Sequence, residues 1–239
     1  MFRFKQFSVK NEGAAFKVGT DAVLLGSAAS VSGSERRILD AGTGTGIIAL
    51  MLCQRLHAVA GGDATVSVLG IDVDPASAQE ATENFAASPW AAKMEARCLP
   101  LEQLESDEFD LIVSNPPYFE NSLLNPDSKK RTARHVAEEG LSWRSLLSFA
   151  ADHLSKGGRL AMILPADIAE KARAASAPEG MGLSRILNIK TSPNKPVTRV
   201  ILEFTKGAPE LMEESLTIQE AGAYTPAYLA LTKEFHIFI

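Results

Sequence analysis

The chain has 239 residues, of which 46% are hydrophobic and 22% are charged. This composition is typical of one large globular domain and excludes disordered, collagen-like and coiled-coil proteins. No uninterrupted apolar run approaches the roughly 20 residues that cross a bilayer, so no membrane association is expected. The net charge of -5, taken alone, argues against a nucleic-acid partner.

The compartment follows from the cysteines and the N-terminus. Cys53 and Cys98 stand alone, with neither a CxxC pair nor a histidine cluster nearby. The first residues lack the apolar segment and cleavage site of a secretory signal. We therefore expect a cytoplasmic protein with no disulfide and no metal site.

The charge is strongly segregated along the chain. Residues 1–20, 129–135 and 185–206 together carry +11, which leaves -16 on the remaining residues. An acidic chain of this kind can still present basic surfaces to a polyanion, so the net charge excludes no nucleic-acid partner. We expect the three basic stretches to flank the catalytic end of the predicted sheet.

The predicted elements alternate between strands and helices. An apolar strand at 37–40 leads through a glycine-rich turn into a helix that extends to His57. A second strand at 65–72 is followed by an alanine-rich helix that begins at Pro75. Further strands are expected at 94–99, 109–114, 159–164, 185–190 and 198–204, and further helices at 141–154 and 167–175.

This order predicts an α/β fold: a doubly wound, mostly parallel, Rossmann-like sheet of seven strands. The last two strands are joined by a tight Ser-Pro-Asn-Lys-Pro connection, which favours a terminal antiparallel hairpin. Residues 36–206 form the predicted catalytic domain. Residues 1–35 are expected to be a leader that packs on it, and residues 207–239 a C-terminal appendage of the same domain.

The turn after the first strand, Asp40-Ala-Gly-Thr-Gly-Thr-Gly46, predicts a cofactor site. Its spacing is GxGxG, and a carboxylate at the mouth of the turn would repel a pyrophosphate. S-adenosylmethionine (AdoMet) carries an ammonium and a sulfonium and no phosphate, so Asp40 would attract it. Gly42, Gly44 and Gly46 would let the backbone approach this cofactor, and Asp72 would accept bonds from its ribose hydroxyls. A backbone contact from Cys98 or Leu99, or the Glu102 side chain, could hold the adenine; the sequence leaves these open.

The predicted catalytic residues follow the strand at 109–114, in the sequence Asn115-Pro116-Pro117-Tyr118-Phe119. The Asn115 side chain and the Pro116 carbonyl would offer two acceptors that grip an NH2 group by both hydrogens. This grip localises the nitrogen lone pair toward a sulfonium methyl, and positioning then supplies most of the acceleration. Tyr118 would stack on a planar substrate, and no general base is required.

With both motifs, the chain resembles the class I AdoMet-dependent methyltransferases of the Asn-Pro-Pro-Tyr type. Further segments, at 2–7 together with 16–26, at 131–135 and at 224–228, resemble the bacterial tRNA1(Val) (adenine-N6)-methyltransferases. This resemblance covers nearly the whole chain. The resemblance implies methylation of the exocyclic N6 amine of the adenosine 3′ of the anticodon in valine tRNA. An anticodon-loop base is already partly unstacked, so presenting it in the pocket costs less free energy than flipping a base out of a duplex.

Further residues are candidates for substrate binding. The segment after the catalytic motif lacks a clear element, and we interpret it as a substrate lid that makes phosphate contacts. The candidates in the motif and the lid are Pro117, Phe119, Lys129, Lys130, Arg131 and Arg134. Thr20 and Asp21 could line the AdoMet pocket or cap a helix that begins at Ala22.

The leading hypothesis is thus a tRNA adenine N6-methyltransferase that uses AdoMet and no metal, with tRNA as its partner. No stable protein partner is implied. One alternative is methylation of ribosomal RNA or of a protein glutamine by the same amine grip. Another alternative, from a different class, is a non-catalytic AdoMet-fold module that binds RNA.

Overall fold

The computed structural model describes residues 1–14, 17–61, 65–105, 108–117 and 141–236. Its centre is an eight-stranded sheet in the order β10-β8-β9-β7-β6-β3-β4-β5. The strands are β3 (Arg37–Ala41), β4 (Ser67–Asp72), β5 (Met94–Cys98), β6 (Phe109–Ser114), β7 (Leu154–Pro165), β8 (Met181–Lys190), β9 (Val197–Lys206) and β10 (Met212–Thr217). β9 runs antiparallel to both of its neighbours, β7 and β8, whereas the other neighbouring pairs are parallel.

The predicted doubly wound fold and its terminal antiparallel hairpin are confirmed, but the predicted count of seven strands is wrong. The eighth strand, β10, lies at the edge of the sheet beside β8, within the segment 207–239 that was expected to be an appendage. Most of its side chains are exposed, and Leu216 is its buried residue. An edge strand with so little buried surface lacks the apolar run by which the other strands were predicted.

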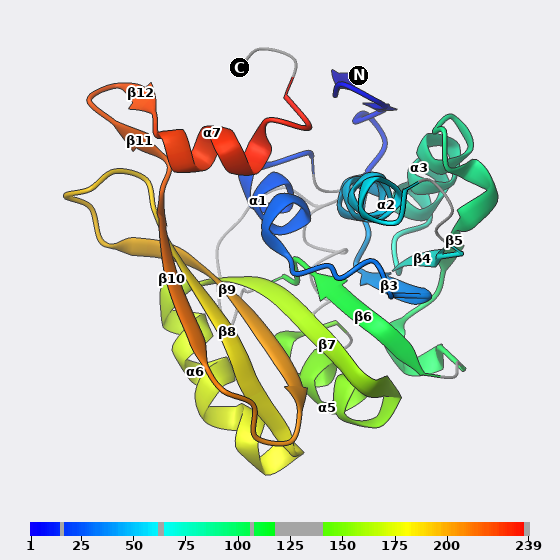
Figure 1. Ribbon diagram of the computed structural model, residues 1–239. Helices are drawn as coiled ribbons and strands as arrows, with labels where there is room; N and C mark the ends of the chain where they lie inside the picture. The colour runs from blue at the N-terminus through cyan, green and yellow to red at the C-terminus, as the bar shows by residue number, and fades with distance from the viewer. Residues whose placement is uncertain (15–16, 62–64, 106–107, 118–140, 237–239) are drawn as a thin grey trace, which may run out of the picture.

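Helices cover both faces of the sheet and form three layers (Figure 1). The helices are α1 (Thr20–Ala28), α2 (Ile47–Val59), α3 (Pro75–Ala86), α5 (Trp143–His153), α6 (Ala166–Ser176) and α7 (Pro226–Thr232). Helices α1, α2, α3 and α7 pack on one face, and α5 and α6 pack on the other. None of the helices in the described ranges is long and apolar enough to span a membrane.

Strand β6 shows how the sequence builds the two cores. Leu111 and Val113 belong to the core beneath α1 and α2, while Ile112 between them belongs to the core beneath α5 and α6. Successive side chains of a strand point to opposite faces, so a continuous apolar run serves a strand that is covered on both sides. This burial fixes the end of β6, where the predicted catalytic residues begin.

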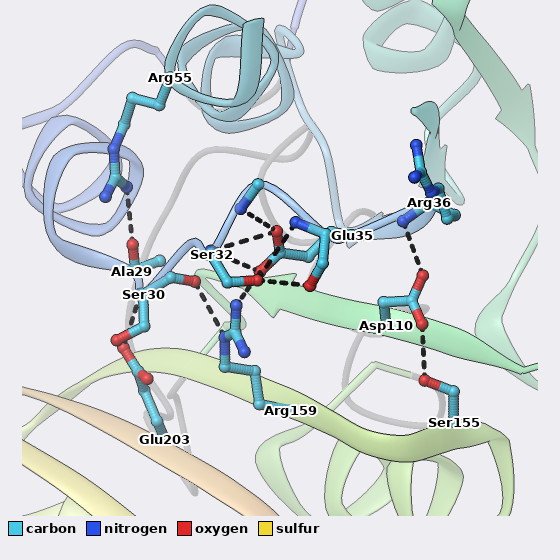
Figure 2. Close-up of polar contacts among 12 residues, drawn as sticks. Ala29, Ser30, Ser32, Glu35, Arg36, Arg55, Asp110, Ser155, Arg159 and Glu203 are labelled. Carbon is cyan, nitrogen blue, oxygen red and sulfur yellow. Dashed lines mark hydrogen bonds and ion pairs between the residues drawn. The ribbon is translucent and has the colours of Figure 1, made fainter. Parts of the chain in front are cut away.

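A buried polar network attaches the segment between α1 and β3 to the sheet (Figure 2). Arg159 of β7 pairs with Glu35 and donates from Nε to the Ser30 carbonyl at 2.9 Å. Glu203 of β9 accepts the Ser30 N–H at 2.9 Å, and Arg55 of α2 donates to the Ala29 carbonyl at 2.7 Å. These bonds satisfy backbone groups that have no partner within an element.

The same network continues at the start of β6 and across β8. Asp110 accepts the Arg36 N–H and the Ser155 hydroxyl, each at 2.7 Å. Glu203 also pairs with Arg185 of β8 at 2.8 Å. Each of these carboxylates thus has a hydrogen-bonded cationic or polar partner, which is the condition for burying charge.

Candidate active site

A cavity of about 500 Å³ opens at the carboxyl ends of β3, β4 and β6. Small-molecule sites typically enclose roughly 300–1,000 Å³. The cavity is lined by the leader and the start of α1 (17–22), the glycine turn and the start of α2 (42–45, 47 and 48), the end of β4 and the start of α3 (71–74 and 77), the residues Leu99 and Leu101, the segment 115–117, and Leu141. The predicted cofactor turn and the predicted catalytic segment therefore share one cavity.

The glycine turn needs glycine for two different reasons. Gly44 has a φ of +55°, and a Cβ built on it would meet nothing within 4 Å, so its face toward the cavity is open. Gly46, the residue before α2, has a φ of +80°, and a Cβ there would lie 2.4 Å from Cε1 of Phe85. Gly44 thus leaves room for a ligand, whereas Gly46 allows the close packing of α2 against α3.

Asp40 lies beneath the turn and does not line the cavity. Its Oδ2 accepts the Thr43 hydroxyl at 2.8 Å and the Ala49 N–H of α2 at 3.2 Å. Its Oδ1 is buried without a hydrogen-bond partner among the described residues. Burial raises the pKa of Asp40 to about 7, against these two hydrogen bonds, and the nearby Asp72 adds to the rise. Asp40 therefore holds the turn against the helix that follows it.

Asp72, by contrast, lines the cavity at the end of β4. Its Oδ2 accepts the Gly44 N–H and its Oδ1 accepts the Asp74 N–H, each at 2.9 Å. Burial raises the pKa of this carboxyl, while the two backbone donors oppose the rise. Each oxygen keeps a further lone pair, so the oriented carboxylate can accept the two hydroxyls of a ribose.

The predicted catalytic residues Asn115, Pro116 and Pro117 lie in the cavity wall. Ser114 fixes their position, because its buried hydroxyl donates to the Ala41 carbonyl of β3 at 2.7 Å. The Asn115 Oδ1 atom is buried and has no hydrogen-bond partner among the described residues. A buried acceptor without a partner is costly, so this oxygen is suited to a donor brought by a ligand.

The apolar side of the cavity includes Leu99 and Leu101, which follow β5. Of the three candidates for the adenine contact, Leu99 lies in the wall, whereas Cys98 and Glu102 do not. Thr20 and Asp21 also lie in the wall. Helix α1 begins at Thr20, and no side chain caps it, so the predicted capping role of these two residues is absent.

Glu80, which attaches the leader beside the cavity, was not among the residues predicted from the sequence. This buried residue of α3 accepts three backbone N–H groups, from Glu12 at 2.8 Å, Gly13 at 3.0 Å and Ala14 at 2.8 Å. Burial opposes ionisation of Glu80, but the three donors outweigh it and hold its pKa below the usual value. The ionised carboxylate therefore secures the segment just before the wall residues 17–22.

Asn84, one turn further along α3, joins the leader to the glycine turn. Its amide oxygen accepts the Lys10 N–H at 2.7 Å, and its Nδ2 donates to the Thr45 carbonyl at 2.8 Å. Both partners are distant in sequence, so no local motif marks Asn84 or Glu80. Their spacing of four residues places both on one helix face, and this is the only sequence signal, because the leader that they bind is brought beside α3 by the fold.

The remaining predicted residues are Tyr118, Phe119, Lys129, Lys130, Arg131 and Arg134, which lie outside the described residues. No group of three or more His, Cys, Asp or Glu side chains in the described ranges could hold a metal ion. The lining of the cavity instead suits AdoMet, because it combines an open glycine turn, an oriented carboxylate at Asp72 and an apolar end at Leu99.

The fold agrees with solved structures of low sequence identity. A "predicted O-methyltransferase" from Agrobacterium tumefaciens superposes with a TM-score of 0.65 at 21% identity, over 90% of this chain and 96% of that one. A type I restriction-modification methyltransferase subunit from Streptococcus thermophilus gives 0.60 at 18% identity, over 92% of this chain and 52% of that one. The family model "Methyltransferase small domain" matches residues 14–173. Fold and site thus define an AdoMet-dependent methyltransferase of class I.

Relatives of higher sequence identity place the chain in one family within this class. The tRNA1(Val) (adenine(37)-N6)-methyltransferase of Bacteroides fragilis strain YCH46 is 40% identical over 99% of this chain and 97% of its own length. Those of Trichodesmium erythraeum and Tolumonas auensis are 38% and 37% identical, each over 99% of this chain and over 97% and 96% of their own lengths. The chain belongs to the tRNA1(Val) (adenine(37)-N6)-methyltransferase family.

Proposed function

We propose that this enzyme transfers a methyl group from AdoMet to the N6 amine of adenosine 37, the position 3′ of the anticodon, in valine tRNA. The observation that carries the proposal is the buried Asn115 Oδ1, which lacks a partner among the described residues and lies in one cavity with the glycine turn. The relatives' shared activity supplies the substrate.

The chemistry assigned to the chain is the grip on the amine. Asn115 Oδ1 accepts one amine hydrogen and the Pro116 carbonyl accepts the other, which directs the nitrogen lone pair toward the methyl group. Consecutive prolines have no backbone N–H groups to donate, so the strand β6 ends before them. Their rings fix the backbone φ angles, which keeps this segment rigid at the cavity wall. When bound, AdoMet supplies an electrophilic methyl group on its sulfonium.

The binding roles follow the two halves of the cavity. Asp72 holds the ribose hydroxyls of AdoMet, the turn of Gly42, Gly44 and Gly46 admits its methionine part, and Asp40 supports that turn from below. Tyr118 and Phe119 are assigned to the adenine base. Lys129, Lys130, Arg131 and Arg134 are assigned to the tRNA phosphates, for which basic side chains supply most of the affinity.

The chain is proposed to act as one catalytic unit in the cytoplasm, with residues 36–206 as the methyltransferase domain. The leader 1–35 closes the AdoMet side of the cavity, which its bonds to Glu80 support. The segment 207–239 extends the sheet through β10. No stable protein partner is required for the reaction as proposed.

Labelled methyl transfer tests this function. Unmodified tRNA, ribosomal RNA and a release-factor peptide are each incubated with labelled AdoMet and either the wild type or Asn115→Ala. We expect label in tRNA alone, at adenosine 37, and a loss of about 100-fold or more in kcat for the variant, because it lacks one acceptor of the reacting amine. Label in ribosomal RNA or peptide alone, or equal labelling by the variant, would contradict the proposal.

A further inference from the structure

The segment Tyr224-Thr-Pro-Ala-Tyr228 has no role in the cavity described above. Three of its residues are explained by local structure. Thr225 caps α7, since its hydroxyl accepts the Tyr228 N–H at 3.2 Å and also donates to the Thr217 carbonyl. Pro226 is the first residue of that helix, and Tyr228 is 5% exposed and belongs to the core. Tyr224 remains unexplained, because 49% of it is exposed.

Tyr224 is held in place by a second aromatic ring. Its ring stacks on that of Tyr228, with the centroids 4.9 Å apart and the planes at 28°. Tyr228 is anchored in the core, so the exposed ring of Tyr224 is supported from one side and accessible elsewhere. A tyrosine fixed in this way loses little conformational entropy when a flat ligand binds to it.

The hairpin that presents Tyr224 consists of β11 (Gln219–Glu220) and β12 (Ala223–Tyr224). Its two-residue turn has positive φ at both positions, +49° at Ala221 and +82° at Gly222. Among the described residues Ala221 is the one non-glycine residue with positive φ, a conformation that costs an alanine about 1 kcal/mol. Positive φ at both positions is the pattern favoured in two-residue hairpin turns, so the hairpin has a defined shape.

This hairpin lies on the side of the sheet where the parallel strands have their carboxyl ends, as the active site does. β8, β7 and β6 are mutually parallel, so their carboxyl ends, at Lys190, Pro165 and Ser114, lie on the same side of the sheet. β10 ends there too, because Thr217 pairs with Lys190, and the next residue, Ile218, donates its N–H to the Lys190 carbonyl at 2.9 Å. Figure 1 shows β11 and β12 just beyond the end of β10, next to the β8–β9 turn.

The spacing suits a nucleic acid that reaches the active site. β10 is four strands from β6, which corresponds to about 19 Å at the usual distance between strands. Stacked nucleotides advance about 3.4 Å each along one strand, so this gap corresponds to about six of them. Lys190, the last residue of β8, lies beside the hairpin, since its carbonyl accepts the Ile218 N–H, and Lys195 belongs to the β8–β9 turn. The hairpin itself includes one carboxylate, Glu220. The local charge therefore favours a phosphate backbone.

We infer that Tyr224 is a stacking platform for an unpaired base of the RNA substrate, distinct from the base that is methylated. The inference rests on the proposed tRNA methyltransferase function. Stacking on an aromatic ring suits any base, because every base has a π face, so this contact would position the RNA without reading its sequence. Lys190 and Lys195 would contact the phosphates on either side of that base.

Equilibrium binding of unmodified valine tRNA to Tyr224→Ala tests the platform, with Tyr224→Phe as the conservative variant. Phe2→Ala is the matched control, because Phe2 is another exposed aromatic residue in contact with a neighbouring ring, Phe4, with the centroids 4.9 Å apart. We expect Tyr224→Ala to weaken tRNA binding on the order of tenfold, the usual effect of removing one base stack. Tyr224→Phe and Phe2→Ala should stay within about twofold of the wild type.

Four further measurements distinguish a base-stacking role of Tyr224 from a structural one. AdoMet affinity of Tyr224→Ala should match that of the wild type, and its unfolding midpoint should fall only by what the lost ring contact with Tyr228 contributes. Its KM for tRNA should rise while kcat is kept. Affinity for a fully paired RNA duplex should be equal in wild type and variant, since no unpaired base is available. Unchanged tRNA affinity in Tyr224→Ala, while the wild type methylates tRNA, would overturn the platform alone. A wild type that neither binds nor methylates tRNA would overturn the proposed function.

Discussion

At the scale of single residues, the most informative group is Asp40, because it is buried and has one carboxylate oxygen without a partner among the described residues. Its pKa of about 7 in the folded protein compares with about 3.9 in an unfolded chain. Between these values the folded state binds one proton more than the unfolded state. The stabilising effect of that proton is complete below pH 4 and disappears as the pH rises through 7.

We therefore predict that the ligand-free wild type loses stability between pH 5 and pH 8, by about 2–4 kcal/mol from Asp40. Asp40→Asn lacks the titrating group and keeps an oxygen that can accept the bonds from Thr43 and Ala49. Its free energy of unfolding should vary less with pH over the same range. Urea unfolding of both proteins at several pH values measures the difference, and parallel pH profiles would show that Asp40 is ionised in the folded state.

At the scale of elements, the attachment of the leader to α3 controls the shape of the AdoMet cavity. Glu80→Gln removes the charge and replaces one oxygen by an NH2 group, which cannot accept a backbone N–H. We expect AdoMet to bind about tenfold more weakly, since the wall at 17–22 would lose its support, while kcat at saturating AdoMet is unchanged. Calorimetric titration measures the AdoMet affinity, and amide exchange of residues 12–14 measures whether the leader stays attached to α3.

Glu83→Gln is the matched control for this prediction. Glu83 lies on the same helix, but it is exposed and pairs with Lys10 at the surface. Exposed pairs contribute about 0–1 kcal/mol, so its AdoMet affinity should stay close to that of the wild type. Equal AdoMet affinities of Glu80→Gln and the wild type would show that the leader keeps its place without this carboxylate.

The elements also show what the sequence could predict and why. Strands such as β6 are buried on both faces, so a continuous apolar run reveals them, and the Gly-Thr-Gly-Thr-Gly turn is readable because its conformation requires glycine. β10 could not be predicted from an apolar run, because Leu216 is its single buried side chain. Glu80 was missed because its partners lie 66 to 68 residues away, a pairing that appears when the chain is folded.

At the scale of the whole molecule, the network around Glu203 joins β8 and β9 to the segment after α1. The Glu203 carboxylate is 3% exposed, and it pairs with Arg185, which is held by the Ala28 carbonyl as well. It also accepts the Ser30 N–H. Burial lowers the pKa of the nearby Arg55 to about 10, and Glu203 opposes that effect. One buried carboxylate thus pairs with the Arg185 guanidinium, accepts a backbone N–H and favours the charged form of Arg55.

Glu203→Ala should therefore lower the free energy of unfolding by about 3 kcal/mol or more, because it leaves the Ser30 N–H without its acceptor and removes the buried negative charge that faces Arg185 and Arg55. Glu214→Ala is the matched control, since Glu214 pairs with the same Arg185 at 2.6 Å but its side chain is 43% exposed, and its loss should cost less than about 1 kcal/mol. Urea unfolding measures both values. AdoMet affinity below the unfolding transition should be equal in all three proteins, because the network lies outside the cavity wall. Equal costs for the two variants would mean that Arg185 is held by its exposed partner as firmly as by the buried one.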